Sequence, residues 1–194
     1  MKRFVLFCLL FINSVSLLAG EIVWYEGSVV LKTNVVLTGE ISIEPQYDLI
    51  LHRIHGKMEV YPAHKIQSIY FYDAKENINR KFISLKDSRF FNHHQLLEIV
   101  LKGEVSIYRR QKAWTGKSPS DADGFHYFVR YQDKLVDLQK FRNQVYPHLL
   151  KSTGGILSAF MDERKLNPNS PSNAILIIDF YNHIKKEDHI LAMH

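Results

Sequence analysis

Hydrophobic and polar residues alternate with a period of two from Ser28 onward, which is typical of β-strands that bury one face. In the clearest stretch, residues 35–43, every second side chain is apolar or a glycine, and most of those between are polar. Turn-forming pairs, such as His55 and Gly56 or Lys102 and Gly103, separate several of these stretches and predict hairpins. The pattern predicts ten strands, at residues 29–32, 35–43, 47–54, 58–61, 65–73, 81–85, 96–101, 105–110, 125–131 and 135–138.

The stretch at residues 65–73 is apolar on both faces of the predicted strand. Strict alternation places Ile66, Tyr70 and Tyr72 on one face, and Ile69 and Phe71 on the other. A strand covered on both sides belongs to a closed or sandwiched sheet. We therefore expect an N-terminal antiparallel β-barrel or β-roll, of the small-barrel kind, followed by further β-hairpins.

After Leu138 the apolar period becomes that of an α-helix, with residues 138, 141, 145 and 149 on one stripe. A second helix is predicted around residues 156–161. Ser170 and Pro171 then form an N-cap and first turn for a last helix through Lys186. The core of this helix, residues 174–181, is apolar nearly all round, so this helix is expected to be the most buried. These patterns predict an α+β fold with a β domain at 21–138 and two to three C-terminal helices at 139–194 packed on it.

The first 20 residues have the pattern of a secretory signal peptide. Lys2 and Arg3 precede an apolar run at residues 4–12, and Ala19 and Gly20 offer a small-residue cleavage site. The uninterrupted apolar run is much shorter than the roughly 20 residues of a spanning helix, so we expect no transmembrane anchor after cleavage. The protein is thus predicted to be exported, to the periplasm or outside the cell.

Composition narrows the chemistry of the exported chain. Its single cysteine, Cys8, lies in the predicted leader, so the mature chain is expected to have neither a disulfide nor a cysteine nucleophile. Removal of Lys2 and Arg3 lowers the 25 basic residues to 23 against 20 acidic ones, a net charge of +3. Since this charge is spread evenly, no basic domain is available to follow a phosphate backbone, and nucleic acid is not expected as a partner.

Two groups of residues are candidates for a site in the β domain. The densest basic run contains Arg109 and Arg110, and an anionic glycan or lipid headgroup could bind at Arg109, Tyr108 and Trp114. The alternative is a solvated strand end, with Glu98 and Glu104 as counter-ions. Among the ten histidines, a metal site would require the fold to assemble its ligands from distant segments, namely His52, His64, Asp73 and His93.

The last predicted helix carries a lone charge in its apolar stretch, Asp179, with His183 one turn further on. A buried aspartate must find a cation or several hydrogen-bond donors. The pair is therefore interpreted as an internal brace between this helix and the β domain, or alternatively as an acid–base pair at a cleft.

A set of spaced residues resembles the pattern of small uncharacterised exported bacterial proteins, a family with no assigned activity. Its strand part is Trp24, Gly27, Val29, Leu31, Leu37, Gly39, Ile41, Tyr61, Ala63, Ile66 and residues 71–73. Residues 180–182, after a helix end at Lys165 and Leu166, are similar to the helical tails of that family. The first five strands also resemble small SH3-like or Sm-like barrels, which implies a fold and no activity.

The sequence contains no nucleophile elbow, no glycine-rich phosphate loop and no zinc-protease helix motif. It therefore favours a non-enzymatic binding or structural module of the cell envelope, without a cofactor, whose partner is another envelope protein or a small ligand. The alternative is a metal-dependent hydrolase that uses the histidine and aspartate set.

Overall fold

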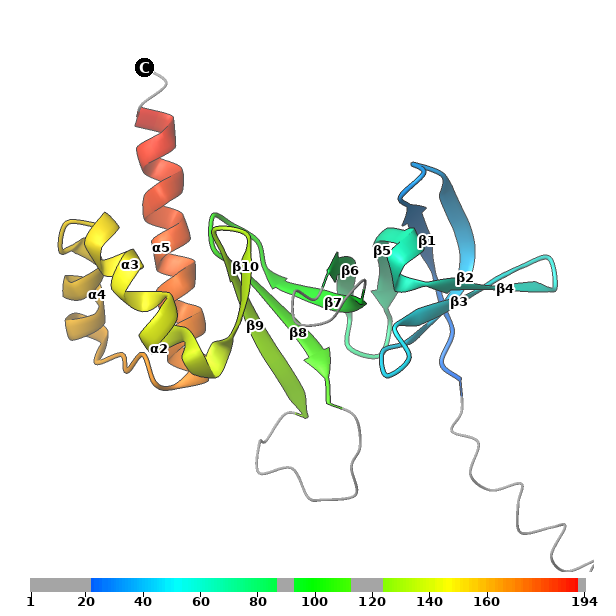
Figure 1. Ribbon diagram of the computed structural model, residues 1–194, viewed down its shortest axis with the longest axis horizontal. Helices are drawn as coiled ribbons and strands as arrows, with labels where there is room; N and C mark the ends of the chain where they lie inside the picture. The colour runs from blue at the N-terminus through cyan, green and yellow to red at the C-terminus, as the bar shows by residue number, and fades with distance from the viewer. Residues whose placement is uncertain (1–21, 87–92, 113–123, 192–194) are drawn as a thin grey trace, which may run out of the picture.

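The computed structural model describes residues 22–86, 93–112 and 124–191, with the backbone alone for residues 188–191. Its ten strands form one antiparallel sheet in the order β10-β9-β8-β7-β6-β5-β1-β2-β3-β4 (Figure 1). Strands that follow each other along the chain are neighbours, except β4 and β5, because β5 pairs with β1 and β4 lies at the end of the sheet. The strands are β1 (Tyr25–Leu31), β2 (Val36–Glu44), β3 (Leu49–Ile54), β4 (Lys57–Pro62), β5 (Ile66–Asp73), β6 (Ile78–Lys86), β7 (His94–Leu101), β8 (Ser106–Gln111), β9 (Phe125–Tyr131) and β10 (Lys134–Asp137).

The sheet is not closed into a barrel, because β4 and β10 stand at its two ends and do not pair with each other. The prediction of a barrel is wrong because it relied on strict alternation in β5. A β-bulge opposite Val30 and Leu31 shifts the register and brings Ile66 onto the same face as Ile69 and Phe71. The opposite face of β5 carries Tyr70 and Tyr72, which are 39% and 49% exposed. Only one face of the strand is covered.

The helices follow the sheet and pack against its β8–β10 end, as the left half of Figure 1 shows. They are α2 (Phe141–Gln144), α3 (Tyr146–Ser152), α4 (Ile156–Arg164) and α5 (Pro171–Leu191), with 3-10 turns η1 (Ala63–Lys65) and η2 (Leu138–Lys140). The architecture is thus α+β with C-terminal helices. None of the helices in the described ranges is long and apolar enough to cross a membrane.

Three clusters of buried apolar side chains hold the fold together. The first joins Ile107 and Val129 of the sheet, and Val105 of the turn before β8, to the helices. The second contains Val29 of β1 and Ile41 of β2, together with buried apolar residues of β3, β5 and β7. A third, smaller cluster centres on Leu97, Tyr108 and Phe128. The first cluster therefore lies at the β8–β10 end of the sheet, and the second extends across strands from β3 to β7.

Candidate functional site

A cleft of about 390 Å³ lies over the middle strands of the sheet, and Phe71 and Leu96 of the second apolar cluster form part of its lining. Strands β5 to β8 contribute charged side chains to it. The end of β2 and the turn that follows contribute Glu44, Pro45 and Gln46. Its volume is in the range of small-molecule sites. The lining residues used below are Tyr25, Glu44, Pro45, Phe71, Asp73, Arg80, Phe82, Glu98, Arg109, Arg110 and Phe125.

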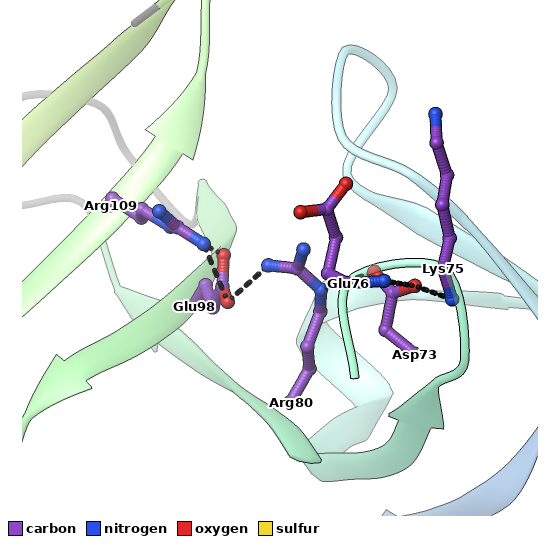
Figure 2. Close-up of polar contacts among 6 residues, drawn as sticks. All are labelled: Asp73, Lys75, Glu76, Arg80, Glu98 and Arg109. Carbon is purple, nitrogen blue, oxygen red and sulfur yellow. Dashed lines mark hydrogen bonds and ion pairs between the residues drawn. The ribbon is translucent and has the colours of Figure 1, made fainter. Parts of the chain in front are cut away.

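Four side chains of alternating charge form a continuous chain along this cleft (Figure 2). Arg80 Nε donates to Asp73 Oδ2 at 2.8 Å, and Arg80 Nη1 donates to Glu98 Oε1 at 2.7 Å. Arg109 approaches the same carboxylate from the other side, with Nε to Oε2 at 2.7 Å and Nη2 to Oε1 at 3.0 Å. The strand register explains this arrangement, since Glu98 of β7 lies directly opposite Arg109 of β8. Each carboxylate therefore holds an arginine in a fixed orientation.

The carboxylate of Asp73 is also anchored to the turn that follows β5. Its Oδ1 accepts the main-chain N–H groups of Lys75 and Glu76 at 3.1 and 3.2 Å. Burial acts to raise the pKa of Asp73, but the hydrogen bonds from Arg80 and from this turn outweigh burial and hold the pKa below its usual value. Asp73 is thus held in its charged form.

The two arginines that bind these carboxylates, Arg80 and Arg109, both have raised pKa values. Burial acts to lower the pKa of Arg80, but its bonds to Asp73 and Glu98 outweigh burial and raise that pKa. For Arg109, the hydrogen bond to Glu98 is the main reason that its pKa is raised. Both guanidinium groups therefore remain charged and act as fixed hydrogen-bond donors.

Aromatic rings line the cleft beside the charged groups. Tyr25 packs on Phe71 with ring centroids 4.3 Å apart, and Phe71 stacks on Phe82 at 5.8 Å. On the other side, the guanidinium of Arg109 lies 4.3 Å from the ring centroid of Phe125. The cleft therefore combines an apolar surface with charged groups.

A bridge between β8 and the turn after β2 lies beside the cleft, since Arg110 and Pro45 both belong to its lining. Arg110 Nη2 donates to the main-chain oxygen of Pro45 at 2.5 Å and to Asp48 Oδ2 at 3.1 Å. The other oxygen of Asp48 accepts the N–H of Leu96 at 3.0 Å, and His93 Nε2 lies 3.3 Å from Oδ2. The sequence analysis missed Asp48. Its position among turn residues was the only signal, because its partners lie 48 and 62 residues away.

The sequence-predicted ligand site is only partly brought together. Arg109 lies in the cleft, and Glu98 is its partner as the sequence suggested. Tyr108, the next residue on β8, points to the opposite face and is buried in the third apolar cluster. Trp114 lies outside the described residues. Glu104, the other suggested counter-ion, instead accepts a hydrogen bond from the hydroxyl of Tyr181 at 3.0 Å.

The structure does not bring the four proposed metal ligands together. His52 is buried and its Nε2 bonds the main-chain oxygen of Thr38 at 3.1 Å, whereas His64 is exposed on η1. Asp73 holds Arg80, and His93 lies against Asp48. In the described part of the chain, no three histidine, cysteine, aspartate or glutamate side chains are grouped as metal ligands.

The interpretation of Asp179 as a buried brace is wrong, because Asp179 is exposed, and so is His183, which pairs with Glu187 at 3.2 Å. Helix α5 buries one face and leaves the other open, so its apolar stretch does not imply complete burial. The neighbouring Asn182 is the brace. It accepts the N–H of Val105 at 2.9 Å and donates to the oxygen of Val105 at 2.8 Å, which fixes α5 to the turn after β7.

Comparison with models of protein families, with curated proteins and with solved structures finds no match to this chain. The similarity to small exported bacterial proteins therefore stays a prediction. The geometry of the cleft is the observation on which a function can be argued.

Proposed function

We propose that this protein is an exported, non-enzymatic binding module of the cell envelope, in the periplasm or outside the cell, and that its cleft binds a small ligand. The observation that carries this proposal is the cleft over the middle strands of the sheet, lined by aromatic rings and by arginines in fixed orientations. Sites with groups held in place before binding lose less entropy when a ligand arrives.

The chemistry of the lining favours binding over catalysis. The carboxylates of Asp73 and Glu98 are both engaged by arginines, and the pKa of Asp73 lies below its usual value. A carboxylate stabilised in this way is a weak proton acceptor, since an effective general base needs a pKa near the working pH. These groups are better suited to position a ligand than to move its protons.

Ligand binding can be tested by NMR with the full mature chain and a library of small fragments. We expect binders to shift the Nε–H signals of Arg80 and Arg109, and we expect Arg109→Met to change the affinity of these binders, because it changes the shape and charge of the cleft lining. Arg53→Met is the matched control, because Arg53 has the same kind of two-point bond to Glu40 outside the cleft lining. Fragments that bind only elsewhere, or an equal change of affinity in both variants, would contradict the proposal.

Export is tested separately by mass spectrometry of the protein from its native cells. The expected mature N-terminus follows Ala19 or Gly20. A chain that retains Lys2 and Arg3 would show that the leader is not removed, and would count against the envelope assignment while leaving the cleft as a binding site.

A further inference from the structure

The cleft contains three guanidinium groups, yet its charges do not favour an anion. Each arginine already has at least one carboxylate partner within 3.1 Å. An anionic ligand would have to compete with these carboxylates for the same donors, and it would be repelled by them. The pairs are Arg80 with Asp73 and Glu98, Arg109 with Glu98, and Arg110 with Asp48.

One carboxylate that lines the cleft, that of Glu44, has no arginine partner among the described residues. Glu44, the last residue of β2, lines the cleft and is half-buried. Among the described residues, no hydrogen bond or ion pair to its carboxylate is found. Of the residues that line the cleft, Glu44, Asp73 and Glu98 are acidic and Arg80, Arg109 and Arg110 are basic, so their charges balance. Among these acidic residues, Glu44 is the carboxylate that no arginine engages.

The apolar part of the cleft lies over the same region of the sheet. Tyr25, Phe71 and Phe82 form one continuous aromatic stack, and all three line the cleft with Glu44. Aromatic faces attract cations as well as apolar groups, because the ring quadrupole is negative at its face. A carboxylate and aromatic rings in one cleft thus favour a ligand with a positive charge and an apolar body.

We infer that the cleft selects a compact organic cation, namely an amine joined to an apolar body. The amine pairs with Glu44, and the body lies against Tyr25 and Phe82, the two half-buried rings of the stack. This inference rests on the proposed function, since it names the class of ligand for the same cleft. The amine is supplied either by a free small molecule or by a lysine side chain of a peptide, and the two sources share this chemistry.

Three probes of similar shape and different charge test the inference, with NMR titration of the full mature chain. They are 2-phenylethylamine, 2-phenylethanol and phenylacetate. We expect the amine to bind in the cleft at least about tenfold more tightly than phenylacetate, because a hydrogen bond to the charged Glu44 is worth about that much. A blocked tripeptide with a central lysine forms a second arm. Tighter binding of this peptide than of the amine indicates a peptide source, and the reverse indicates a free amine.

Glu44→Gln should remove the preference for the amine, with about a tenfold loss of affinity. Glu26→Gln changes the net charge equally at an exposed position of β1 outside the cleft lining, and should leave the affinity unchanged. Binding of phenylacetate or 2-phenylethanol in the cleft as tightly as the amine would overturn the inference while the cleft remains a binding site. Failure of all three probes and the peptide to bind in the cleft would count against both the inference and the proposed function.

Discussion

Replacement of Glu98 by glutamine tests whether the charge chain of the cleft stabilises the fold. The Glu98 side chain is only 9% exposed and accepts three hydrogen bonds, one from Arg80 and two from Arg109. Glutamine has nearly the same shape, but it has no charge and turns an N–H₂ group toward one of the guanidinium groups. Both arginines would then remain in the cleft while their shared counter-charge is lost.

The expected loss follows from the burial of this group. Removal of one partner from a buried ion pair costs about 3–5 kcal/mol. Arg80 and Arg109 are 15% and 22% exposed, so water compensates in part and we expect the lower end, about 3 kcal/mol. For a chain of this length, that loss lowers the melting temperature by roughly 10 °C. Urea unfolding and thermal melts followed by circular dichroism measure both quantities.

The matched control is Glu40→Gln. Glu40 lies opposite Arg53 on paired strands and makes a comparable two-point bond at 2.6 and 2.8 Å, but both side chains are nearly 40% exposed. Water replaces the lost partner there, so we expect a much smaller loss in the free energy of unfolding than for Glu98→Gln. Equal losses in the two variants, or a stable Glu98→Gln protein, would refute the argument from burial.

Three further predictions concern other positions. Because the folded-state pKa of Asp73 is lowered, its contribution to stability is present above about pH 4 and is lost as the pH falls below that value; urea unfolding of Asp73→Asn should therefore be less sensitive to acid, and an unchanged acid dependence would speak against this. Asn182→Ala removes both side-chain hydrogen bonds to the main chain of Val105 and should lower the free energy of unfolding in urea by about 2 kcal/mol. Asp179→Asn, on the exposed face of α5, should leave this free energy unchanged. A larger loss for Asp179→Asn than for Asn182→Ala would restore Asp179 as the brace. Gly27→Ala would place a methyl group against the main-chain oxygen of Tyr70 and should lower the melting temperature, so an unchanged melt would show that β1 and β5 can separate without cost.

The local parts of the fold could be predicted from the sequence, because they depend on neighbours along the chain. The predicted strand at residues 125–131 has the same bounds as β9, and the turn at His55 and Gly56 joins β3 to β4 with positive φ at both residues. The start of β6 at Ile78 was missed, because residues 78–80 are too polar to form an alternating pattern.

The barrel and the cleft could not be predicted, because they depend on distant contacts. One extra residue in β5 moves Ile66 to the other face, and no local pattern shows where such a bulge will occur. Within the cleft, the sequence suggested Glu98 as a partner for Arg109, since the two lie on strands joined by a short turn. The contact of Arg110 with Asp48 depends on how far the sheet bends, and hydrophobic periodicity contains no information on curvature.

The bond from Arg110 to the turn after β2 has a mechanical consequence. Within the sheet, β8 is connected to β2 only through the four strands between them, β7, β6, β5 and β1. Each pair of neighbouring strands along this series can twist slightly. Arg110 instead joins β8 directly to the turn after β2 through side-chain hydrogen bonds. The width of the cleft beside this turn is thus limited by the reach of Arg110, together with the bond from the N–H of Leu96 to Asp48.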